Sequence, residues 1–208
     1  MTIAHAKKAG MSVPAHVAEL WGERGVVDNF VCFLNNTVPL ASCAHILEIG
    51  AGTGRFLEPI LNIARAPRYE VYETNAQWSN YLAKTYSVVA HQADGESLNA
   101  TPDATQHLIH AHCLFVYLLP VRSFTYFQEI TRVCAPGGFV VFDAFTDDLV
   151  DLSRMRAWID KGLAWPIVLS RMRIREFFRE NGFELVTDNY TMPTYGGLSR
   201  YFIFRKPL

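Results

Sequence analysis

Apolar and polar residues follow two different periods along the chain, and these periods predict the order of helices and strands. Between residues 14 and 37 apolar side chains recur every three or four positions, which predicts two short helices interrupted near residues 22–25. Residues 1–13 lack this period, and we expect them to form a loose terminus. From residue 44 onward, short apolar runs alternate with amphipathic segments. This alternation predicts a parallel sheet with helices on both faces.

Seven segments have the length and composition of strands. They are residues 45–49, 69–72, 88–91, 107–112, 139–142, 184–190 and 198–205. Helices are expected at residues 55–65, 76–86, 121–134 and 147–161, and a further helix is expected to run from a cap at Ser170 to Glu180. The sequence therefore predicts an α/β fold with a helical insertion between the fifth and sixth strands.

Composition and charge exclude several classes of protein. The 208 residues suffice for one domain with a sizeable core, and the net charge of −1 gives no electrostatic reason to expect a nucleic-acid partner. The basic cluster at residues 171–175 is expected to be a solvated helix face. The four cysteines lack metal-ligand spacing, and no apolar run approaches the roughly 20 residues that span a bilayer. We expect a cytoplasmic protein without membrane insertion; the oligomeric state stays open.

The glycine-rich segment after the first strand carries the clearest chemical signal. Gly50, Gly52 and Gly54 allow positive φ and let a ligand approach the backbone closely. A dinucleotide fingerprint would need a third glycine where Arg55 stands. Glu48, two residues before the turn, would repel a pyrophosphate but could accept hydrogen bonds from a ligand ammonium. The spacing therefore favours a different ligand from NAD, and a turn without any ligand is the alternative.

The segment Glu48-Ile49-Gly50-Ala51-Gly52-Thr53-Gly54 resembles the first motif of the class I S-adenosylmethionine-dependent methyltransferases, Glu/Asp-x-Gly-x-Gly-x-Gly. Residues 132–143 are similar to the helix, Pro-Gly-Gly turn and fifth strand of that family. The resemblance covers about residues 44–206. It implies a Rossmann-like, seven-stranded, mostly parallel sheet that ends in an antiparallel hairpin. It also implies a catalytic domain over residues 44–208, with an insertion at about 144–169 and a helical cover formed by residues 1–43.

The same resemblance implies S-adenosylmethionine as the cofactor. Glu73, at the end of the second strand, would bind the two ribose hydroxyls, and Asp94 would accept the adenine amine. The alternatives are an exposed strand-end glutamate and an Asp-Gly turn. The expected cofactor-binding set is Glu48, Gly50, Ala51, Gly52, Gly54, Arg55, Glu73, Thr74, Asp94, Gly95, Glu96 and His112.

His112 is the main candidate for catalysis. It stands at the exit of the fourth strand, where the family places residues beside the transferred methyl, and a histidine can accept a proton near neutral pH. A wall of the cofactor pocket is the alternative role. The segment His112-Cys113-Leu114-Phe115 replaces the family's Asn/Asp-Pro-Pro-Tyr signature, which argues against amide, adenine or glutamine N-methylation. His110 shares the face of His112 and is expected to be a hydrogen-bonded core histidine.

Asp143, at the end of the fifth strand, is the second catalytic candidate, either as a general base or as a metal ligand. A metal would need further carboxylates, and Asp147 and Asp148 are expected instead to begin the inserted helix, where negative charge suits the helix dipole. We therefore expect no metal.

Four aromatic residues are expected to bind the substrate because they lie in segments that would cover the strand ends. Such rings can hold a cation or form an apolar pocket, although each could instead be core packing. They are Trp21, Tyr117, Trp165 and Tyr195.

Together these features predict methyl transfer from S-adenosylmethionine to a small molecule, with an oxygen acceptor favoured. The alternatives are N-methylation of a small molecule and a non-catalytic S-adenosylmethionine-binding protein. A nicotinamide oxidoreductase is disfavoured by Arg55.

Overall fold

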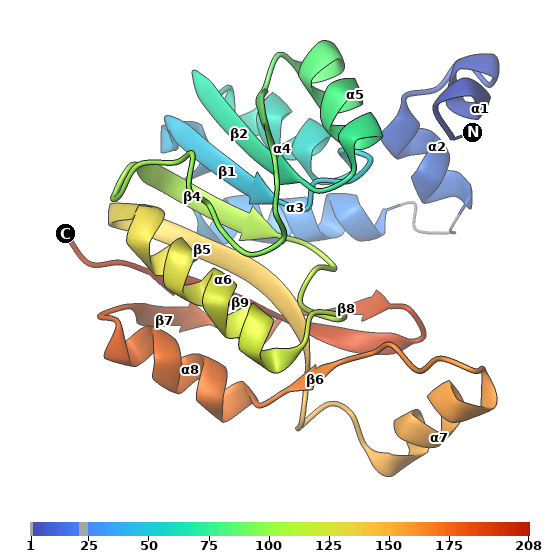
Figure 1. Cartoon of the computed structure of the whole chain (residues 1–208), viewed down its shortest axis with the longest axis vertical. Helices are drawn as coiled ribbons and strands as arrows, with labels where there is room; N and C mark the ends of the chain where they lie inside the picture. The colour runs from blue at the N-terminus through green and yellow to red at the C-terminus, as the bar shows by residue number, and fades with distance from the viewer. Residues whose placement is uncertain (1, 21–24) are drawn as a thin grey trace. The chain divides into compact units, whose positions relative to one another are not determined.

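The computed structural model describes residues 2–20 and 25–208. These residues form two compact units, divided between Asp94 and Gly95. Each unit combines a sheet with helices, as the course of the chain in Figure 1 shows. Among the described residues, no helix has both the length and the apolar composition needed to cross a bilayer.

The first unit contains parallel strands in the order β3-β2-β1. Ile49 pairs with Tyr72, and Glu73 pairs with Gln92, so neighbouring strands end at one edge of this sheet. The Asn75 side chain caps α5 by accepting the N–H groups of Gln77 and Trp78. The elements are α1 (Thr2–Lys8), α2 (Val13–Leu20), α3 (Val26–Thr37), η1 (Leu40–Ser42), β1 (His45–Ile49), α4 (Leu57–Ala64), β2 (Arg68–Glu73), α5 (Ala76–Tyr86) and β3 (Val89–Gln92).

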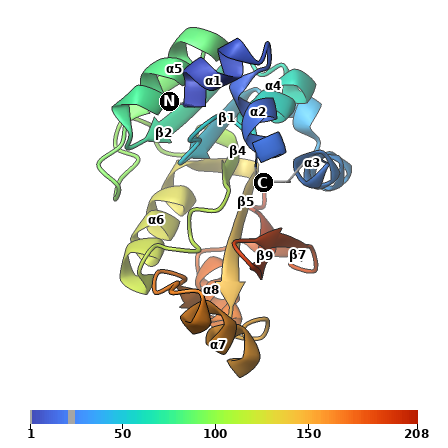
Figure 2. The ribbon, with the colours of Figure 1, turned by 90° about the vertical axis from the view of Figure 1, so that its right-hand side faces the viewer.

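The expectation of a loose N-terminus is wrong, because Thr2–Lys8 form helix α1. Ala6 is buried together with Val13 and Val17 of α2, and Trp78 and Tyr81 of α5 pack against this cluster. Figure 2 shows α1 beside α5. The helix has few apolar side chains, so its sequence shows no clear period even though tertiary contacts stabilise it.

The second unit contains strands in the order β4-β5-β9-β7. β4 and β5 are parallel, whereas β9 is antiparallel to β5, β7 and β8, which confirms the expected C-terminal antiparallel strands. β7 ends at Thr187, and residues 191–194 form the separate strand β8. The elements are β4 (Gln106–Ala111), α6 (Pro120–Val133), β5 (Cys134–Thr146), α7 (Leu152–Asp160), β6 (Val168–Leu169), α8 (Arg171–Glu180), β7 (Glu184–Thr187), β8 (Thr191–Thr194) and β9 (Gly197–Arg205).

Phenylalanine side chains form the core on one face of the strands of the second unit. Phe178 of α8 stacks on Phe204 of β9 with a 4.2 Å separation of ring centroids. Phe127 of α6 lies 4.9 Å from Phe142 of β5 and 5.4 Å from Phe178. Helices α6 and α8 therefore cover the same face, and their burial of aromatic surface stabilises the unit.

The inserted helix α7 begins later than predicted. Asp151 caps it by accepting the Arg154 N–H, so the expectation that Asp147 and Asp148 begin this helix is wrong. Those two aspartates instead accept hydrogen bonds from the backbone N–H and the guanidinium of Arg171. The expectation that residues 171–175 form a solvated basic face is therefore also wrong for Arg171, because carboxylates bind its side chain.

Candidate active site

The turn between β1 and α4 contains two glycines whose missing side chains serve different purposes. Gly52 has φ +53° and Gly54 has φ +82°, in the region that disfavours other residues. A Cβ on Gly54 would lie 3.0 Å from Leu82 Cδ2 and 3.2 Å from Tyr86 Cε2, so this glycine permits close packing on α5. Among the described residues, a Cβ on Gly52 would meet only the Gly50 carbonyl oxygen, at 4.0 Å. Gly52 therefore faces open space that a ligand can occupy.

Glu73 is tied to this turn. Its Oε2 accepts the Gly52 N–H at 2.7 Å, and its Oε1 accepts the Asn75 N–H at 2.8 Å. The residue is 6% exposed, so the alternative of a solvent-exposed strand-end glutamate does not hold. A carboxylate has about four acceptor positions, and these two bonds leave acceptor capacity for a pair of vicinal hydroxyls.

Glu48 lies in β1, buried to 2% exposure. The Tyr69 hydroxyl donates a hydrogen bond to Glu48 Oε2 at 2.9 Å. Burial raises the pKa of Glu48 to about 8, and the charge of Glu73 adds to this effect, while the bond from Tyr69 opposes it. Burial therefore favours the protonated form of Glu48, and a ligand ammonium would favour its ionised form.

The remaining cofactor candidates have more varied surroundings. Ala51 is buried in the glycine turn. Thr74 and Asp94 are exposed, and the Thr74 carbonyl accepts a bond from Gln92. Gly95 has φ +86°, as a tight turn after Asp94 requires. Glu96 forms a largely exposed ion pair with Arg122, with a 2.6 Å separation. The structure thus groups the glycine turn with Glu73 but shows no comparable contact for Thr74.

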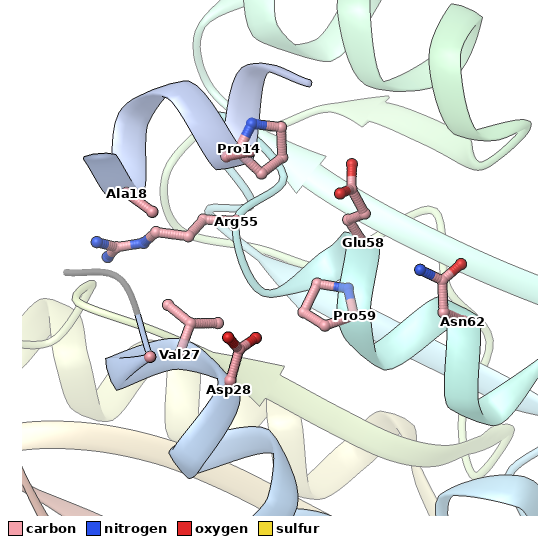
Figure 3. A pocket seen from close by; sticks show the side chains of 10 residues that line it. Pro14, Ala18, Val27, Asp28, Arg55, Glu58, Pro59 and Asn62 are labelled. Carbon is pink, nitrogen blue, oxygen red and sulfur yellow. The ribbon is translucent and has the colours of Figure 1, made fainter. Parts of the chain in front are cut away.

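Arg55 lines a cavity of about 520 Å³ in the first unit. Figure 3 shows its guanidinium extending from the glycine turn toward Ala18 of α2, above Val27 and Asp28 at the start of α3. The cavity is lined by Pro14, Ala15, Ala18, Gly25, Val27, Asp28, Arg55, Glu58, Pro59 and Asn62. Arg55 therefore lies between the glycine turn and the N-terminal helices α2 and α3.

His112 is the middle member of a buried hydrogen-bonded chain in the second unit. Its Nδ1 lies 3.0 Å from the Tyr201 hydroxyl, and its Nε2 lies 3.0 Å from His110 Nδ1. His110 and Tyr201 are fully buried and His112 is 6% exposed, so the expectation of a hydrogen-bonded core histidine at 110 is confirmed. Burial lowers the pKa of His110 to about 3. Because both ring nitrogens of His112 are bound, accepting a substrate proton requires exchange of one of these bonds.

Asp143 is fully buried in β5. Its Oδ1 accepts the Cys113 N–H at 2.6 Å. Cys113 has φ +54°, a conformation that is unfavourable for a residue with a side chain. Asp143 therefore stabilises the backbone that follows His112.

Three of the four aromatic substrate candidates form one cluster. The rings of Tyr117 and Trp165 are 6.1 Å apart, and those of Trp165 and Tyr195 are 5.0 Å apart, at 68° and 89° between planes. The three side chains are 36–45% exposed, which rules out simple core packing. Trp21, the fourth candidate, lies outside the described residues.

Tyr69 and Tyr201 are the main residues that the sequence reasoning missed. Each bonds a predicted site residue from another strand, at Glu48 and His112 respectively. A tyrosine within an otherwise apolar strand was the available signal, since a buried hydroxyl needs a partner. The partner itself depends on strand register, which the sequence does not specify.

Solved structures share this fold at low sequence identity. The magnesium protoporphyrin IX methyltransferase of Synechocystis, with bound S-adenosylhomocysteine, matches with a TM-score of 0.68 and 11% identity over 93% of this chain and 85% of that one. The N-methyltransferase NodS of Bradyrhizobium japonicum, also with S-adenosylhomocysteine, gives 0.65 and 17% over 89% and 88%. An O-methyltransferase family protein of Burkholderia thailandensis gives 0.68 and 10% over 94% and 60%. No curated protein sequence matches the chain.

Residues 46–138 match the family described as "Methyltransferase domain". The matched region begins in β1, contains the glycine turn and Glu73, and ends in β5. It therefore includes the segment that resembles the first methyltransferase motif. This domain match and the shared fold of the solved methyltransferases support the class I S-adenosylmethionine-dependent methyltransferase superfamily that the first motif resembles.

Proposed function

We propose that this enzyme transfers a methyl group from S-adenosylmethionine to an oxygen atom of a small molecule. The assignment of the cofactor site rests on the hydrogen bond from the Gly52 N–H to Glu73, which joins an open turn to a buried carboxylate. Bound S-adenosylmethionine supplies a methyl group activated by its sulfonium. The protein then has to bind, orient and exclude water, and alignment alone can lower the barrier considerably.

Each predicted cofactor residue has a proposed task. Glu73 accepts the ribose hydroxyls, and the turn from Gly50 to Gly54 leaves room for the ligand beside Gly52. Glu48 accepts a hydrogen bond from the amino acid portion. Asp94 and Gly95 contact the adenine, with Ala51, Arg55, Thr74, Glu96 and His112 as further contacts. We propose residues 1–43 as a cover of the catalytic domain over residues 44–208, which the Arg55 cavity between α2, α3 and α4 supports.

An oxygen acceptor is the finer part of the proposal. The absence of the Asn/Asp-Pro-Pro-Tyr signature at His112-Cys113-Leu114-Phe115 disfavours several N-methylations. Neighbours in fold include both an O-methyltransferase family protein and the N-methyltransferase NodS, so nitrogen is kept as the second candidate. The half-exposed cluster of Tyr117, Trp165 and Tyr195 supports an acceptor of small-molecule size.

We propose His112 as the residue that accepts the acceptor's proton, after exchange of its bond to Tyr201 or His110. Asp143 contributes by holding the Cys113 backbone through the 2.6 Å bond. No metal is needed for this chemistry, because the sulfonium already activates the methyl.

A labelled-methyl assay tests the proposal. The full chain is incubated with methyl-labelled S-adenosylmethionine and a metabolite extract, and labelled products and S-adenosylhomocysteine are measured. A labelled small-molecule ether or ester supports oxygen transfer, and a labelled amine supports the nitrogen alternative. Binding of S-adenosylhomocysteine without any labelled product supports a non-catalytic binding protein. Binding of NAD in preference to S-adenosylhomocysteine would overturn the cofactor assignment.

A further inference from the structure

The cluster of Tyr117, Trp165 and Tyr195 is held in place by backbone contacts. The Ile167 N–H donates to the Val116 carbonyl at 2.8 Å, which fixes the loop of Trp165 against that of Tyr117. Arg154 of α7 donates to the Gly196 carbonyl, which fixes the β8–β9 turn against α7. In Figure 1 this turn and α7 belong to the orange-to-red part of the chain. The rings are therefore presented by an ordered surface, which reduces the entropic cost of binding.

Tyrosine at position 195 is unfavourable for the geometry of its turn. Thr194 pairs with Gly197, so Tyr195 and Gly196 form a two-residue hairpin loop. Both loop residues have positive φ, +47° and +76°. Such loops strongly prefer Asn-Gly, because a bulky residue is unfavourable at positive φ. A strained residue of this kind points to a role for its side chain beyond the turn.

A positive charge lies beside the hairpin turn that carries Tyr195. Lys161 Nζ is 3.6 Å from the position that a Cβ on Gly196 would occupy. In the part of the chain that the structure describes, no acidic side chain forms an ion pair with Lys161. Arg154 adds a second cationic group at the same turn. Aromatic rings alone would suit a cationic ligand, but these two groups would repel one.

We propose that this cluster binds a planar aromatic acceptor that carries a negative charge, with its ring against Trp165 and Tyr195 and its anionic group near Lys161. The perpendicular rings of Trp165 and Tyr195 form a corner in which a flat ring can contact one face and one edge. This inference rests on the proposed function and names the class of its acceptor.

Calorimetry on the full chain, saturated with S-adenosylhomocysteine, tests the inference with three probes of similar size: 4-hydroxybenzoate, its neutral analogue 4-hydroxybenzamide, and phenyltrimethylammonium. The carboxylate is expected to bind most tightly. Lys161→Gln should weaken the carboxylate about tenfold and the amide less than about twofold. The control Arg156→Gln removes an exposed charge from α7, the helix that Lys161 follows, and should change neither.

The Tyr195→Asn variant distinguishes a loss of probe affinity from a loss of folding stability. Asparagine suits the turn better, so this variant should melt no lower than the wild type while binding both aromatic probes about fivefold or more weakly. An unchanged carboxylate-to-amide ratio in Lys161→Gln, tighter binding of the ammonium, or full binding by Tyr195→Asn would each overturn the inference. If S-adenosylhomocysteine binds and the carboxylate does not, this inference alone fails. If S-adenosylhomocysteine does not bind, the proposed function fails with it.

Discussion

Single residues in the glycine turn are distinguished by what surrounds their Cα atoms. Gly54 is close to Leu82 and Tyr86, whereas Gly52 faces open space and donates its N–H to Glu73. Gly54 is therefore required for packing against α5, whereas Gly52 leaves space that we propose a ligand occupies.

Gly52→Val should abolish binding of S-adenosylhomocysteine, because the new side chain would occupy the ligand's volume. Calorimetry measures the affinity. Gly10→Val is the matched control, since Gly10 has a similar φ of +66° and open surroundings but lies in the turn after α1. The control should lose stability through backbone strain and keep its affinity. Unchanged binding by Gly52→Val would contradict the assignment.

Glu48→Gln should stabilise the unliganded protein strongly at pH 8 and much less at pH 5. The folded-state pKa of Glu48 is about 8, above its ordinary value of about 4.3. Between these values the folded state binds more protons than the unfolded state, so wild-type stability falls as pH rises through this window. Glutamine removes that dependence and can still accept the Tyr69 bond. Urea midpoints at both pH values test this; an equal difference at pH 5 and pH 8 would refute it.

His112→Ala should lower turnover about 100-fold while leaving the affinity for S-adenosylhomocysteine within about twofold. Initial rates with the acceptor found in the labelled-methyl assay provide the test, and His5→Ala, at an exposed position of α1, is the control. Equal turnover in the variant would show that His112 only forms a wall of the cofactor pocket.

Tyr201→Phe removes the hydroxyl 3.0 Å from His112 and should shift the pH dependence of the rate.

At the scale of elements, carboxylates hold the start of α8 against neighbouring segments. Asp188 is buried and accepts two bonds from Arg171, from Nε at 2.8 Å and from Nη2 at 2.9 Å. Asp148 bonds both Arg171 and Arg200. These acids offset the unfavourable position of an arginine at a helix N-terminus.

Asp188→Asn should lower the free energy of unfolding by about 2 kcal/mol, because it disrupts a buried, bidentate, charge-assisted contact. Glu176→Gln is the matched control: its pair with Arg179 spans 3.9 Å between mostly exposed side chains and should contribute less than about 0.5 kcal/mol. Denaturant unfolding measures both. A loss no larger for Asp188→Asn than for the control would contradict this account of α8.

Elements with local signals were predicted well. The caps at Asn75 and Ser170 explain why α5 and α8 begin where expected. Elements that depend on distant contacts were not: α1 relies on packing against α5, and Asp147 binds Arg171 rather than its own helix. The glycine turn was predicted from a continuous motif and Glu73 from its place at the end of the second strand, whereas the partners Tyr69 and Tyr201 depend on strand register.

For the molecule as a whole, most of the proposed cofactor contacts lie in the first unit, while the proposed acceptor contacts lie in the second. The buried Tyr201–His112–His110 chain and the aromatic cluster both lie there. Substitutions after Gly95 should therefore mainly affect the rate of methyl transfer to the acceptor. Substitutions before Gly95 should mainly affect the affinity for the cofactor.

A crystal structure of the enzyme with S-adenosylhomocysteine tests the central claim most directly. We predict the ribose hydroxyls within hydrogen-bond distance of the Glu73 carboxylate, with the ligand filling the space beside Gly52. A nucleoside bound elsewhere, with this space empty, would contradict the account.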